Sequence, residues 1–163
     1  MGKAFDRLEY AELLKAERHD DAIAYVDRFR EKDLDDPSLK RRAALARGGK
    51  GELILTACDR SGEIPSKEQI DTMCDLFKEA IALDPYLADP YWDLAVIHMR
   101  FLDAPDQAAA YLADAKRLGY KHPLMKRLEA IVHPLVHEER EKFVESAGQA
   151  GARLVILDIP LLF

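Results

Sequence analysis

The chain has 163 residues, 48% of them hydrophobic and 33% charged, and its 24 Lys and Arg against 30 Asp and Glu give a net charge of −6. This composition argues against wholesale disorder, and a chain of this length buries about two-thirds of its unfolded surface without disulfides or metals. The acidic balance, with Lys40-Arg41-Arg42 as the densest basic run, argues against nucleic-acid binding. No apolar run approaches the about 20 residues of a membrane span and the start is not typical of a signal peptide, so we expect a cytoplasmic protein without membrane contact.

The first part of the chain is predicted to be helical with interruptions. Residues 4–17 and 21–32 carry apolar side chains at the spacing of one helix face. Each is too short to be stable alone in water, so we expect the two helices to pair. The run Arg47-Gly48-Gly49-Lys50-Gly51 predicts a loop at about 47–52, and a second loop is expected at about 60–66.

A clear helix signal covers residues 67–83. Ser66 and Gln69 predict a capping box at its start, in which each side chain accepts a hydrogen bond from the backbone N–H of the other residue. Asp84-Pro85 predicts its end. The apolar residues that follow the i, i+3, i+4, i+7 spacing of one buried face are Ile70, Met73, Cys74, Phe77, Ala80 and Ile81.

Two more helices are predicted to follow, one from Asp89-Pro90 and one from Asp103-Ala104-Pro105. We expect Asp89 to be the N-cap of the first of them, because its side chain can accept from a free backbone N–H. Gly119 is expected to end the second. His98 lies on the apolar face of the first, where a packing residue with satisfied hydrogen bonds is the expected role.

The spacing of small and large residues in these helices has a repeating form. It is carried by Phe77, Ala80, Leu83, Asp84, Pro85, Tyr91, Leu94, Ala95, Ala108, Leu112 and Ala115. This pattern resembles the tetratricopeptide repeat, while residues 4–37 resemble a looser copy and residues 38–65 do not fit the about 34-residue period. The resemblance implies a mainly α fold of antiparallel helical pairs over residues 1–126, with a concave surface for a protein or peptide partner.

Four aromatic residues are candidates for lining a partner groove in such an array: Tyr86, Tyr91, Trp92 and Tyr111. The alternative is that they belong to the core. Tyr91 and Trp92 are adjacent and cannot both face one side of a helix, so we expect one of them to be half exposed.

The character of the sequence changes over residues 127–163. Residues 127–147 predict one or two helices that extend the array, ended by Gly148 and Gly151. Residues 154–159 are continuously β-branched and aliphatic, which is typical of a strand buried on both faces, yet no partner strand is predicted in this chain. We therefore expect residues 154–163 to be the least securely packed apolar segment, lying on the helices, pairing with another chain through self-association, or remaining poorly ordered.

Two motifs lie in this last part: Leu128-Glu129-Ala130-Ile131-Val132-His133-Pro134-Leu135-Val136 and Val155-Ile156-Leu157-Asp158-Ile159-Pro160-Leu161-Leu162-Phe163. Together they resemble an internal fragment of dephospho-CoA kinase, the bacterial-type enzyme that completes coenzyme A synthesis by phosphorylating a ribose hydroxyl with ATP. The resemblance implies that His133 lies near the dephospho-CoA side of a cleft, and Pro134 next to it is a further residue of the motif. It also implies that the second motif, with Asp158, Pro160, Leu161 and Leu162, is a central strand whose carboxyl end faces the active site.

The resemblance does not extend to the catalytic parts of that family. No G-x-x-x-x-G-K-[ST] phosphate loop occurs, and Gly48-Gly49-Lys50-Gly51 lacks both the first glycine and the hydroxyl residue. The arginine-bearing lid is absent, and the sequence ends before the glutamate that normally follows the second motif. Positioning and charge neutralisation supply nearly all of phosphoryl-transfer catalysis, so we expect no enzymatic activity and no cofactor.

Metal binding is not expected either. Cys58 and Cys74 fit no metal-ligand spacing. His133 and His137 stand at i, i+4, but zinc needs at least a third protein ligand. Pro134 suits the first turn of a helix, so His133 is expected to be a helix-start residue.

Three functions remain open on this evidence. The first, which we favour, is a protein-interaction scaffold of helical pairs (residues 1–126) with a non-catalytic dephospho-CoA kinase-like segment (residues 127–163). The second is a dephospho-CoA kinase in truncated or fused form. The third is a recombined or misassembled reading frame with no selected function.

Overall fold

The computed structural model describes residues 4–152 and residue 154, and this part of the chain forms seven helices and no strand. The helices are α1 (Arg7–Lys15), α2 (His19–Arg30), α3 (Pro37–Ser61), α4 (Lys67–Leu83), α5 (Asp89–Arg100), α6 (Pro105–Arg117) and α7 (Met125–Gln149). The expected mainly α class is confirmed. The strand predicted at 154–159 lies, apart from Leu154, outside the described residues. None of the helices in the described part is both long and apolar enough to cross a membrane.

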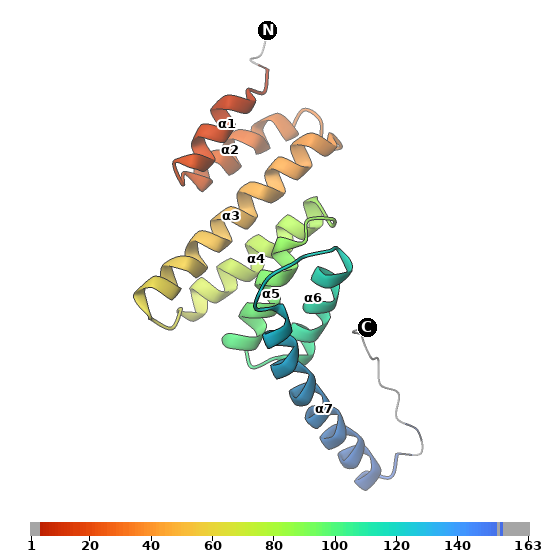
Figure 1. Ribbon diagram of the computed structural model, residues 1–163. Coiled ribbons are helices and arrows are strands. Elements are labelled where there is room, and N and C mark those ends of the chain that lie inside the picture. Colours follow the sequence, from red (N-terminus) through yellow and green to blue (C-terminus); the bar gives the residue numbers. More distant parts are fainter. Residues whose placement is uncertain (1–3, 153, 155–163) are drawn as a thin grey trace.

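Helices that follow one another in the chain pack against one another, antiparallel, and this builds an array from α1 at one end to α7 at the other (Figure 1). α3 also touches α5, which is not its neighbour in the chain. The predicted antiparallel pairing of helices is therefore present.

The predicted start of α4 is confirmed in atomic detail. The backbone N–H of Ser66 donates to Gln69 Oε1 at 2.8 Å, and the N–H of Gln69 donates to Ser66 Oγ at 3.2 Å. The prediction for α5 is wrong by one position, because Ala88 is the N-cap and makes no side-chain cap bond. Asp89 is instead the first helical residue, where a carboxylate favours the positive end of the helix dipole.

The loop predicted at 47–52 is wrong, because α3 runs through it without interruption. The glycines there permit close contacts with other elements. A Cβ on Gly51 would lie 2.7 Å from the ring of Phe77 in α4, and one on Gly49 would lie 2.7 Å from the imidazole of His19 in α2. The second predicted loop is present, since α3 ends at Ser61 and Gly62 takes a left-handed φ of 69°.

One part of the interior is built from the apolar faces of α4, α5 and α6, and other parts lie among α1, α2 and α3 and between α6 and α7. Its largest fully buried side chains include Phe77, Met73, Leu94, Ile97 and Leu112. His98 lies among them with 5% of its surface exposed and its ring 5.2 Å from that of Tyr111. The packing role is confirmed but the satisfied hydrogen bonds are not, because within the described residues neither Nδ1 nor Nε2 has a partner.

α7 confirms the helix predicted at 127–147 and corrects the role given to His133. Pro134 lies inside α7, so His133 is an interior helical residue and not a helix start. Both side chains are exposed. Proline removes one backbone hydrogen bond from a helix interior, and α7 continues past it to Gln149. Of the α7 residues only Val132 and Val136 are buried, and in Figure 1 the second half of the helix extends away from the array.

Candidate functional site

The four aromatic residues proposed for a groove do not share an exposed surface. Tyr91 and Trp92 are 8% and 7% exposed, so the expectation that one of them is half exposed is wrong. Tyr111 is partly buried and packs against the same cluster as these two, whereas Tyr86 is 79% exposed. Both Tyr91 and Trp92 are covered because α5 packs against neighbouring helices and also lies under residues 118–124.

The cover over Trp92 is a stack of aromatic rings, which we call the aromatic stack: Trp92, Tyr120 and His122. The centroid of the Trp92 ring lies 4.7 Å from that of His122 and 5.6 Å from that of Tyr120. The planes of Tyr120 and His122 differ by 1°. Offset stacking at these distances holds residues 118–124 on α5. Tyr120 and His122 were not among the predicted site residues, although their spacing of two after a turn at Gly119 can place both rings on one side of a non-helical segment.

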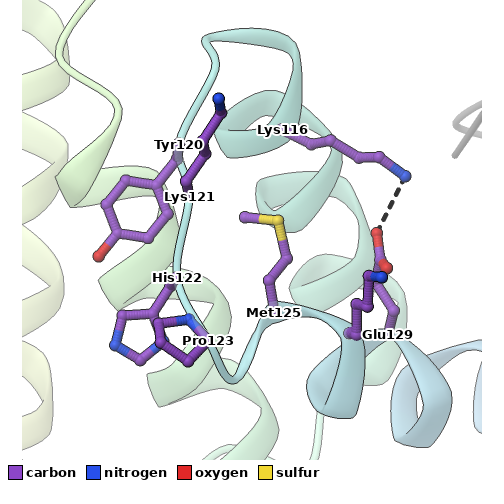
Figure 2. A pocket seen from close by; sticks show the side chains of 8 residues that line it. Lys116, Tyr120, Lys121, His122, Pro123, Met125 and Glu129 are labelled. Carbon is purple, nitrogen blue, oxygen red and sulfur yellow. Dashed lines mark hydrogen bonds and ion pairs between the residues drawn. The ribbon is translucent and has the colours of Figure 1, made fainter.

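The segment 118–124 also forms one wall of a cavity of about 480 Å³ between the end of α6 and the start of α7, the lysine pocket. Figure 2 shows its eight lining side chains, with the rings of Tyr120 and His122 on one side and Met125 toward the centre. On the other side Lys116 Nζ donates to Glu129 Oε1 at 3.1 Å. Lys121 and Lys126 also line this cavity.

Next to the aromatic stack lies a group of carboxylates, the acidic patch: Glu52 of α3, and Asp89 and Asp93 of α5. Burial, with Glu52 and Asp89 nearby, raises the pKa of Asp93 to about 7. Burial and these same carboxylates raise the pKa of Tyr120 to about 12, which places the patch beside the aromatic stack. Within the described residues Asp93 has no hydrogen bond or ion pair. This partly buried carboxyl is the most perturbed acid in the described part of the chain.

The residues singled out by the kinase-like motifs lie elsewhere. His133 and Pro134 are exposed on α7, and His137 Nε2 lies 3.2 Å from Glu141 Oε1 on the same helix. No group of three His, Cys, Asp or Glu that could hold a metal is found among the described residues. Asp158, Pro160, Leu161 and Leu162 lie outside the described residues.

Comparison with known proteins finds one recurring relative. A segment of this chain is similar to dephospho-CoA kinase. It is 55% identical to that of Bartonella henselae over 38 residues, which are 23% of this chain and 20% of the enzyme. It is 59% identical to that of Paramagnetospirillum magneticum and 54% identical to that of Brucella melitensis, each over 39 residues, or 24% of this chain and 18% and 20% of the enzymes.

The chain thus spans about a fifth of the length of these relatives. The match covers 38 or 39 residues, which is about the length of residues 127–163. No family model matches the chain, and no solved structure matches it. The helical array is therefore described from the structure alone, and no family match supports the tetratricopeptide resemblance.

Proposed function

We propose that this chain is a protein-interaction scaffold, cytoplasmic and of bacterial type, whose kinase-like segment does not catalyse. Its binding face is formed by α3, α5 and residues 118–124, and its occupant is a segment of a protein partner. The observation that carries the proposal is Asp93, a partly buried carboxyl without a counter-ion beside two further carboxylates. Burying a charge without a partner opposes folding, and such strongly perturbed groups cluster at functional sites.

The surroundings of Asp93 fit the binding of a positively charged side chain. Glu52 and Asp89 add negative charge from two helices that touch. Tyr120 borders the patch with an aromatic ring, and an Arg or Lys can lie against such a ring as well as pair with the carboxylates. A partner that supplies this charge would relieve the unfavourable burial of Asp93.

Affinity capture with a matched pair of variants tests this face. The immobilised full chain, its Asp93→Asn variant and its Asp75→Asn variant are each exposed to a bacterial lysate in increasing amounts. Asp75 is an exposed acid on α4 outside the acidic patch. We expect a saturable partner on the wild type and on Asp75→Asn, and loss of that partner on Asp93→Asn. Equal recovery by all three chains would place the binding face elsewhere, and no saturable partner on any of them would reject the scaffold.

A second candidate is dephospho-CoA kinase activity in a truncated or fused form, favoured by the identity of 46–59% over 39 residues. The phosphate loop that holds ATP in such enzymes does not occur in the 163 residues. We therefore propose that the chain alone does not phosphorylate dephospho-CoA. A coupled assay of ADP release with Mg-ATP and dephospho-CoA decides this, and turnover above the enzyme-free rate would reject our assignment.

A further inference from the structure

The lysine pocket lies in a basic segment of an otherwise acidic protein. Between Asp114 and Glu129 the sequence has five basic residues and no acidic one, in a chain of net charge −6. The five are Lys116, Arg117, Lys121, Lys126 and Arg127. An acidic protein that gathers cations around one cavity creates a local positive potential, which attracts anions.

Some of these cations are already paired and some are free for a ligand. Lys116 pairs with Glu129 at 3.1 Å, and Arg117 pairs with Asp114 at 2.9 Å. Lys121 and Lys126 line the cavity and have no carboxylate partner in the described part of the chain. Two ammonium groups at the rim of the lysine pocket are thus available to an anion.

The interior of the lysine pocket is not suited to a bare hydrated ion. Met125, Pro123 and Tyr120 contribute to its lining. Its volume of about 480 Å³ is that of an ordinary small-molecule site. Because the aromatic stack fixes Tyr120 and His122 against Trp92, this wall is already formed before a ligand arrives. The ligand that fits has an apolar body and an anionic end.

We propose that the lysine pocket binds a carboxylate carried on an apolar body. Lys121 and Lys126 supply the positive charge that attracts the carboxylate, and Met125 and Pro123 contact the apolar part. α7 begins here with neither a side-chain cap nor an acidic residue in its first turn, so its helix dipole adds to the attraction. Such a carboxylate is presented by an acidic peptide with a neighbouring apolar side chain, or by a free organic acid.

The Met125 methyl group provides a direct reporter by NMR, because the chain has only four methionines. The full chain, labelled at its methionine methyl groups, is titrated with 3-phenylpropionate and with a capped Phe-Glu dipeptide. The neutral controls are 3-phenylpropionamide and a capped Phe-Gln dipeptide, and inorganic phosphate tests for simple anion binding. We expect a saturable shift of Met125 with a carboxylate and not with its neutral analogue. Response to the dipeptide alone identifies a peptide as the source, and response to the free acid identifies an organic acid.

Charge variants around the lysine pocket should move the affinity in opposite directions. Losing two ammonium partners in Lys121→Gln/Lys126→Gln should weaken carboxylate binding about tenfold. Glu129→Gln frees Lys116 and removes a repelling charge, so it should strengthen binding several-fold, by an amount on the order of one ionic contact. The control Lys67→Gln/Lys78→Gln lies on α4 and should leave the affinity unchanged.

Carboxylate binding in the lysine pocket does not depend on partner binding at the acidic patch, so either can be rejected while the other holds. Equal affinity for the acids and their amides would reduce the lysine pocket to an apolar cavity and reject the inference. Absence of a saturable shift at Met125, or a double lysine variant that binds like wild type, would reject it as well. A phosphate response equal to that of the carboxylates would show that the apolar body plays no part, which also contradicts it.

Discussion

Asp93 should make the protein less stable as the pH rises through the weakly acidic range. Its folded pKa is raised from 3.8 to about 7, so between these values the folded chain holds a proton that the unfolded chain has lost. With respect to Asp93 the folded protein is therefore most stable below about pH 3.8, and it loses this stability as the pH rises to about 7. Asp93→Asn should raise the free energy of unfolding by about 1–2 kcal/mol at pH 8, a figure reduced for the partial exposure of the side chain, and should leave it unchanged at pH 4.

Urea unfolding of the wild type, Asp93→Asn and the control Asp75→Asn at both pH values measures this effect. A difference between wild type and Asp93→Asn that is the same at pH 4 and pH 8 would contradict the prediction. If Asp93→Asn is more stable and also loses the captured partner, the Asp93 carboxylate lowers the stability of the wild-type protein but is needed for binding.

His98 should produce the opposite pH dependence. Burial, helped by the nearby Lys78, lowers the pKa of His98 below its usual 6.5. The unfolded chain therefore binds a proton below pH 6.5 that the folded chain does not, and stability falls as the pH drops below that value. His98→Phe removes two unsatisfied buried nitrogens and should raise the free energy of unfolding by about 1–2 kcal/mol, most at pH 5. Unfolding curves at pH 5 and pH 8 that shift by equal amounts would argue against this.

At the scale of single residues, the sequence predicted that His98 is buried, but not that its nitrogens lack partners. The positions of Trp92, Tyr120 and His122 next to one another depend on how residues 118–124 return over α5. That path follows from tertiary packing, which periodicity along one helix does not contain. For the same reason the environment of Asp93 could not be predicted, since Glu52 lies on a different helix.

The glycines of α3 allow a test of how helices approach one another. Ala at position 51 would place a Cβ 2.7 Å from the fully buried ring of Phe77, so α3 or α4 must shift. Gly51→Ala should lower the free energy of unfolding by about 1–3 kcal/mol through overpacking. At position 48 the nearest atom is 3.9 Å away, on Pro90. Gly48→Ala should therefore gain up to about 1 kcal/mol from better helix propensity.

Thermal and urea unfolding of the two single variants compares the same chemical change, one turn apart on one helix. Opposite signs are the expected result. Two variants that are both stabilised would mean that α3 is not tightly packed at Gly51 and that the contact with Phe77 is loose.

At the scale of helices, the sequence predicted best where local chemistry decides. The capping box at Ser66 and the apolar face of α4 are local features, and the predicted limits of α4 agree with the structure. The loop at 47–52 was predicted because glycine weakens a helix in isolation. The structure keeps α3 helical there because glycine at position 51 lets Phe77 pack closely, and this gain is not visible in the sequence of α3 alone.

At the scale of the whole molecule, α7 is the element with the least cover. Phe143 and Val144 are 57% and 42% exposed, and Phe143 stands on the stripe that begins with the buried Val132 and Val136. Those two residues pack against α6, whereas Phe143 and Val144 belong to none of the buried apolar clusters of the described residues. Residues 154–163 add an apolar run by sequence. Exposed apolar surface of this kind drives association, so we predict weak self-association through this end of the molecule.

Analytical ultracentrifugation over a wide range of concentrations measures this self-association, and two variants separate its two candidate surfaces. Phe143→Ser/Val144→Ser removes the exposed stripe of α7, while Ile156→Asp places a charge within the apolar run of 154–163. If that run forms the contact, as its sequence predicts, Ile156→Asp should abolish the concentration-dependent rise in sedimentation coefficient. If α7 forms it, only the double serine variant should do so. A wild-type chain that sediments as a monomer at every concentration would contradict the prediction.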